Sequence, residues 1–175
     1  MNIRVSIFTL ALLCALPSAR AADFRTLDYG ARCDNLPALE AAQGSGDFDE
    51  RLPSGYQYAF YGRFAEHDAL IAYSCRDEVF FRGAYIFDVV DQADAAILYR
   101  RLKQLVTKER GKPSYDFASA EYRKKMAAVG ATLSLVDTEV AFWDGQRDEA
   151  HLSVAEPGRG HGWRVSLSYT AGGTT

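Results

Sequence analysis

The sequence predicts an α+β fold in which helices pack on one face of an antiparallel sheet. Two observations carry this prediction: a run of three apolar-alternating strands occurs twice, and residues with helical periodicity precede each run. The links between the first strands are also short, which favours antiparallel hairpins. The chain has 175 residues, 48% of them hydrophobic, which suits one domain. We expect a single domain at residues 22–170, with halves at about 22–90 and 91–170, and a disordered tail at 171–175.

Residues 1–21 have the features of a secretory signal peptide. Arg4 supplies an early positive charge, residues 5–16 carry no charge, and small residues precede the expected cleavage site near Ala21. The apolar run is shorter than the roughly 20 residues that a membrane-spanning helix needs, which disfavours a retained anchor. We therefore expect a periplasmic or secreted mature protein with no membrane span after signal removal.

The charge of the mature chain argues against nucleic acid as a partner. Removal of residues 1–21 leaves 18 basic and 23 acidic residues, a formal net charge of −5. The densest basic cluster is Arg100, Arg101 and Lys103 on a predicted helix, where such charges commonly form a solvated face. Binding to a phosphate backbone depends on clustered Lys and Arg, so we expect no nucleic-acid binding.

Two cysteines remain in the mature chain, Cys33 and Cys75. An even number of cysteines in an oxidising compartment predicts a disulfide, and with two candidates only one pairing exists. The alternative is a thiol nucleophile or metal ligand, which we disfavour because exported thiols tend to be oxidised.

The first half is predicted to contain a helix, a loop and three strands. The helix begins at Asn35-Leu36-Pro37, because proline fits a first turn, and it ends at glycine 44. Residues 44–55 are polar and form a loop. Strands follow at 56–64, 68–76 and 78–88, each with period-two alternation. The third strand is apolar on both faces, which predicts a central position, and we group Phe81 with Tyr85 on one of its faces.

The second half is predicted to contain two helices and three strands. Helix 91–110 has Asp91 as its N-cap and stops at Gly111-Lys112-Pro113. A second helix is expected at 116–128. The strands are expected at 132–143, 149–156 and 163–170, where apolar residues alternate with polar ones.

The two halves have a similar order of elements, which suggests a degenerate repeat in which residues 58–62 correspond to residues 140–144. The element order over residues 35–170, with the glycine–proline stop after the long helix, resembles the helix-pair-plus-meander arrangement of β-lactamase inhibitor proteins and of small outer-membrane assembly lipoproteins. This resemblance implies a fold and carries no functional residue to this chain.

Motifs that would indicate catalysis are missing from the sequence. It contains no G-x-S-x-G elbow, no H-E-x-x-H motif and no C-x-x-C pair. The glycine-rich run 158–162 joins two predicted strands, whereas a phosphate-binding loop leads into a helix. His67, next to Glu66 and Asp68, and His161 are the candidates for a metal or a base, and we interpret both as solvated turn residues. We therefore expect no cofactor, no metal and no catalytic residue.

Aromatic side chains on the strands remain as the candidate functional feature. Tyr61 and Trp143 alternate with Phe60 and Phe142, so we expect both to lie exposed on an open sheet face. Tyr and Trp are enriched at the energetic centres of protein interfaces. The sequence favours a non-catalytic binding module that acts as an inhibitor, an immunity factor or an envelope accessory. The alternatives are an envelope hydrolase or metal-dependent enzyme that uses His67 or His161, and a small-ligand carrier.

Overall fold

The computed structural model describes residues 22–117, 139–155 and 162–172. The predicted signal peptide, the helix expected at 116–128 beyond its first two residues, the strand expected from 132 up to 138, and His161 all lie outside these ranges. The elements, in chain order, are α1 (Leu36–Ala42), β1 (Gly46–Asp47), β2 (Tyr58–Phe64), β3 (His67–Arg76), β4 (Val79–Val89), α2 (Gln92–Arg110), β5 (Tyr115–Asp116), β6 (Val140–Asp144), β7 (Asp148–Ala155) and β8 (Trp163–Ala171).

The eight strands form one continuous sheet in the order β1-β2-β3-β4-β8-β7-β6-β5, and every pairing between them is antiparallel. The expected α+β class with an antiparallel sheet is thus confirmed. The ladder between β4 and β8, from Arg82–Thr170 to Val89–Trp163, joins the two halves at the centre of the sheet. Strand β4 is central, as its two apolar faces predicted. The last strand runs one residue into the expected tail, to Ala171.

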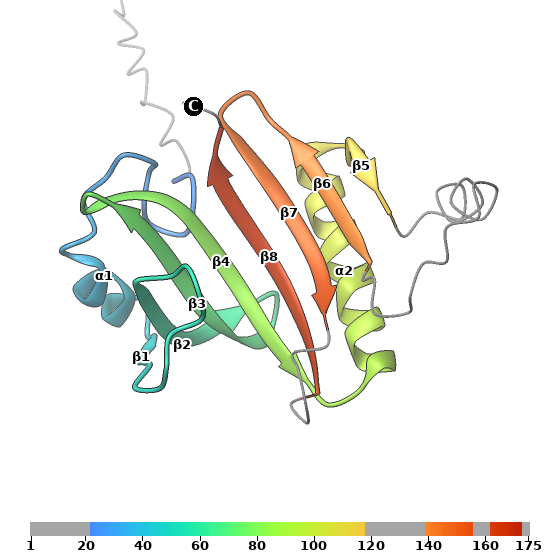
Figure 1. Cartoon of the computed structure of the whole chain (residues 1–175), viewed down its shortest axis with the longest axis horizontal. Helices are drawn as coiled ribbons and strands as arrows, with labels where there is room; N and C mark the ends of the chain where they lie inside the picture. Colours follow the sequence, from blue (N-terminus) through green and yellow to red (C-terminus); the bar gives the residue numbers. More distant parts are fainter. Residues whose placement is uncertain (1–21, 118–138, 156–161, 173–175) are drawn as a thin grey trace, which may run out of the picture.

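Helix α2 covers one face of the sheet, which we call the covered face. Its inward residues are apolar, and it contacts β4, β7 and β8 (Figure 1). The Asp91 side chain accepts a hydrogen bond from the backbone N–H of Asp94, so the predicted N-cap is confirmed. Gly111, with a φ of 84°, ends the helix where expected. None of the helices in the described ranges is long and apolar enough to cross a membrane.

The segment before α1 covers another part of the same face. Phe24 is buried against the rings of Tyr73, Phe80 and Tyr85. A Cβ at Gly83 would lie only 2.3 Å from the Phe24 ring, so glycine is what lets Phe24 reach the sheet. The predicted disulfide between Cys33 and Cys75 is present and joins this segment to β3.

A bulge in β4 changes the face assignment that simple alternation predicts. Tyr73 pairs with Gly83 and Ser74 with Arg82, but Cys75 pairs with Phe80, so Phe81 is an extra residue on β4. Phe80 therefore lies on the covered face with Tyr85, and it is 1% exposed. The grouping of Phe81 with Tyr85 was wrong: Phe80, not Phe81, packs in the core with Tyr85, because the inserted residue shifts the alternation of the strand.

Candidate functional site

The face opposite α2, which we call the open face, carries an apolar row that crosses three strands. Tyr61 on β2 pairs with Leu70 on β3, and Leu70 pairs with Ile86 on β4. Because paired residues of adjacent strands point to the same side, these three side chains form a continuous strip. Tyr61 is 45% exposed, so its ring is available to a partner.

The segment between β1 and β2, residues 48–57, lies over part of the open face and turns the strip into a groove (Figure 1). Phe48 and Tyr56 from this segment pack on Ala59, Ala72 and Ala84 of the sheet. The resulting open-face groove has a volume of about 760 Å³. Its floor is the apolar row, and its wall includes Phe48 and Pro53.

The wall of the groove is fixed to the sheet by one arginine. The Arg82 Nη2 donates a hydrogen bond of 2.8 Å to the Gly55 carbonyl, which also accepts a 2.6 Å bond from the Ser74 hydroxyl. The Arg82 guanidinium lies 4.6 Å from the centre of the Tyr56 ring. Gly55 has a φ of +85°, a conformation that glycine adopts without strain. These contacts hold the wall in place without a regular strand.

A buried carboxylate fixes the base of the same segment. Glu40 of α1 is 0% exposed and accepts hydrogen bonds from Arg25 (2.9 Å), from Ser45 (2.6 Å) and from the Tyr73 hydroxyl. Burial and the hydrogen bond to Glu40 raise the pKa of Tyr73 above its usual value. Since Ser45 immediately precedes β1, the cluster ties α1, β3 and the start of the groove wall together.

Charged side chains border the groove beside the apolar row. Arg63 on β2 lies 3.4 Å from the carboxylate of Asp68 on β3. Arg164 on β8 donates hydrogen bonds of 2.7 Å and 3.1 Å to Asp88 on β4. Glu50 of the wall accepts a 3.2 Å hydrogen bond from the Tyr61 hydroxyl. The groove therefore combines an apolar floor with a charged border.

The two aromatic residues that sequence analysis selected lie in different surroundings. Tyr61 is exposed in the groove, whereas Trp143 is 2% exposed and its ring N–H donates to the Gly111 carbonyl at 3.1 Å. The expectation that Trp143 is exposed was wrong. Phe142 and Trp143 do alternate, but α2 and the chain after it cover the side of Trp143, so Phe142 lies on the open face.

The histidines form no catalytic arrangement within the described residues. His67 Nε2 lies 3.1 Å from Arg101 of α2, and Glu66 forms an ion pair with the same arginine at 3.0 Å. His151 stacks on Phe142 with ring centres 4.4 Å apart, and burial lowers its pKa. In ranges 22–117, 139–155 and 162–172, no group of three His, Cys, Asp or Glu side chains is placed to hold a metal ion.

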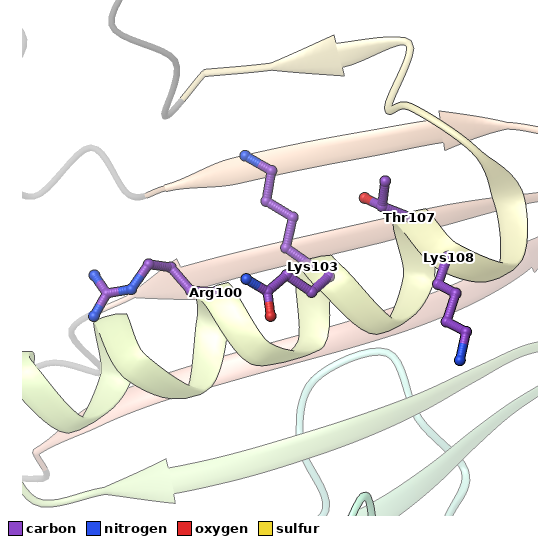
Figure 2. A pocket seen from close by; sticks show the side chains of 5 residues that line it. Arg100, Lys103, Thr107 and Lys108 are labelled. Carbon is purple, nitrogen blue, oxygen red and sulfur yellow. The ribbon is translucent and has the colours of Figure 1, made fainter.

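A second hollow, of about 450 Å³, lies on the outer surface of α2, and its described lining is basic. Figure 2 shows that Arg100, Lys103 and Lys108 extend in different directions from this helix. Lys103 is also paired with Asp116 at 2.6 Å. Side chains that diverge along one helix do not converge on a single ligand group, so we take the open-face groove as the candidate site.

Sequence reasoning identified Tyr61 but missed Leu70, Ile86 and the aspartates beside them. Alternation marks Leu70 and Ile86 as opposite to the core-facing residues of their strands. The register that aligns them with Tyr61 depends on three-dimensional pairing, which one sequence does not reveal. Comparison of the chain with protein-family models, curated proteins and solved structures found no match.

Proposed function

We propose that the protein is an exported, non-catalytic binding module whose binding surface is the open-face groove. The observation that carries this proposal is the apolar row that forms the floor of the groove, in which Tyr61 is 45% exposed. Aromatic and aliphatic side chains surrounded by charged ones are typical of the centre and rim of protein interfaces. An inhibitor, an immunity factor or an envelope-assembly accessory would each use such a surface.

Export is part of the proposal and has its own support. The disulfide between Cys33 and Cys75 is compatible with an oxidising compartment, and buried Phe24 lies only three residues after the expected cleavage site at Ala21. Cleavage there would leave the core-packing ring at the start of the mature chain. The signal-like sequence adds to this support for a periplasmic or secreted location.

The groove also suits a second candidate function, a small-ligand carrier. Its volume of about 760 Å³ falls in the range of about 300–1,000 Å³ typical of small-molecule sites. We favour a macromolecular partner because the floor extends across three strands at the surface, whereas small-molecule sites enclose most of the ligand.

Site-specific photocrosslinking in envelope preparations of the source cell tests the proposal. Tyr61 and Tyr115 are matched positions, because their exposed fractions are 45% and 42% and they lie at opposite ends of the sheet. A photoreactive residue in place of Tyr61 should give a discrete protein adduct, and the same residue in place of Tyr115 should not. The carrier function predicts no protein adduct at Tyr61 and co-purification of a small molecule. Equal labelling at both positions would contradict a groove-specific partner.

We also propose that the two halves are a degenerate repeat. In support, each half runs from a helix through a two-residue strand into three longer strands. The last strands of the two halves, β4 and β8, pair with each other antiparallel, as an approximate twofold relation would require.

A further inference from the structure

This inference rests on the proposed function and names the chemistry of the partner. We propose that the open-face groove binds a Lys or Arg side chain of a partner polypeptide between Asp68 and Asp88, while a neighbouring apolar side chain of the partner packs on Tyr61, Leu70 and Ile86.

Strands β3 and β4 separate at one end of their ladder, and the groove extends to that end. The ladder between β3 and β4 ends at Leu70–Ile86, whereas β2 and β3 stay paired to Phe64–His67, and β4 and β8 stay paired to Val89–Trp163. Residues 67–69 and 87–89 therefore continue as strands on either side of a split. Both Asp68 and Asp88 line the groove at this split.

The two aspartates occupy corresponding positions on the two sides of the split. Continuing the β3–β4 register by two residues beyond Leu70–Ile86 places Asp68 opposite Asp88. Like charges at opposite positions of adjacent strands repel each other. Each aspartate is instead paired outward, with Arg63 or with Arg164. The charged side chains therefore follow one another in the order Arg63, Asp68, Asp88, Arg164. A cation between the two aspartates would be attracted to both and would replace the repulsion between them.

Both aspartates are exposed, so the position between them is accessible to a partner. The side chain of Asp68 is 96% exposed and that of Asp88 is 60% exposed, so each carboxylate keeps acceptor capacity beyond its own arginine. The two charges that border the split are both negative, because Arg63 and Arg164 lie on the outer sides of Asp68 and Asp88. A cationic side chain therefore fits the arrangement best.

The split also favours a polypeptide over a free organic cation. Beyond Leu70–Ile86 the facing edges of β3 and β4 no longer form a ladder with each other, so their backbone groups can accept hydrogen bonds from an extended segment. The apolar row lies beside the aspartates, one pleat further along the same strands. A basic residue two positions from an apolar residue matches this spacing, because residues i and i+2 of an extended segment point to the same side.

The test is an NMR titration of the isotope-labelled mature protein with two acetylated, amidated hexapeptides. The Lys–Leu peptide is Lys-Ser-Leu-Ser-Lys-Ser and the Glu–Leu peptide is Glu-Ser-Leu-Ser-Glu-Ser, so that in each one the charged and apolar side chains share one side of an extended chain. We expect the Lys–Leu peptide to shift the amide signals of Ala69, Leu70 and Ile86, and the Glu–Leu peptide to shift none of them. The double change Asp68→Asn and Asp88→Asn should weaken Lys–Leu binding at least tenfold. Asp144→Asn, an exposed carboxylate elsewhere on the sheet, should leave it unchanged.

Equal binding of both peptides, or binding that the double aspartate variant does not weaken, would overturn the inference. The spectrum of each variant shows whether it is folded, and Asp88→Glu, which keeps the charge, should retain binding. If Tyr61 crosslinks a partner equally well in the double aspartate variant, the inference fails and the proposed function stands. If Tyr61 gives no adduct in the unchanged protein, the proposed function itself fails.

Discussion

Glu40 is a carboxylate that is fully buried, at 0% exposed. A carboxylate removed from water loses its hydration, so it is tolerated only when hydrogen bonds and a counter-charge replace the water. Arg25, Ser45 and Tyr73 supply these contacts, and the Arg25 side chain is itself 13% exposed. The ion pair between Glu66 and Arg101 is the opposite case, because both of its side chains are mostly exposed.

Replacement of Glu40 by Ala should lower the free energy of unfolding by about 3–5 kcal/mol, because Arg25 would then be a largely buried charge without its partner. Glu66→Ala is the matched control, and it should change stability by less than about 1 kcal/mol. Urea denaturation of both variants measures the difference. Similar midpoints for the two variants would mean that the Glu40 cluster does not fix α1 to the sheet.

At the scale of elements, two hairpins use turns whose residues are unusual for their conformation. Ala65 and Glu66 join β2 to β3, and Asp77 and Glu78 join β3 to β4, and all four have positive φ. Two-residue turns of this kind match the twist of the strands and normally contain Asn or Gly. Glu78 forms an exposed ion pair with Arg32 at 2.5 Å. This contact is one that glycine could not make, and it partly offsets the strain of a positive φ at a residue with a Cβ.

Glu78→Gly should be more stable than Glu78→Ala by about 1 kcal/mol, since glycine adopts a positive φ without the Cβ clash. Both variants lose the ion pair with Arg32, so their comparison isolates the backbone effect. Thermal unfolding of the two proteins measures it. An equal or lower midpoint for the glycine variant would show that the turn is not strained at this position.

The sequence predicted the bounds of the elements better than the sheet face on which individual side chains lie. Capping by Asp91 and the stop at Gly111 are local signals, so α2 was located to within one residue. The side occupied by Phe80 depends on the bulge at Phe81, and the burial of Trp143 depends on what packs above β6. These are tertiary effects that alternation does not contain. The groove was harder still to predict from the sequence, because its lining combines residues from β2, β3, β4 and β8.

For the whole molecule, the disulfide connects the segment that covers the core to the sheet beneath it. Cys33 is 1% exposed, and Cys75 lies on β3 beyond the bulge. The bond closes a loop of sequence separation 42, and loops of such length restrict the unfolded chain substantially. The same loop contains α1, β1, β2 and the groove wall, so the bond stabilises the region that carries the candidate site.

Reduction of the disulfide should lower the melting temperature by several degrees, because a loss of about 2–4 kcal/mol is expected for a bond of this kind. A scan with and without reductant measures the shift. The double variant Cys33→Ala and Cys75→Ala should melt at the lower temperature and should not respond to reductant. A reductant effect that persists in this variant would assign the shift to another cause.

The ladder between β4 and β8 has a consequence for how the chain acquires its structure. On one side, residues 82–89 pair with residues 163–170, which come much later in the chain. Contacts between such distant residues slow folding, because a long loop must close before they form. Because synthesis runs from the N-terminus, one edge of β4 stays unpaired until residues 163–170 have been made. An unpaired strand edge can pair with another chain, so this topology exposes the nascent protein to aggregation until β8 is made.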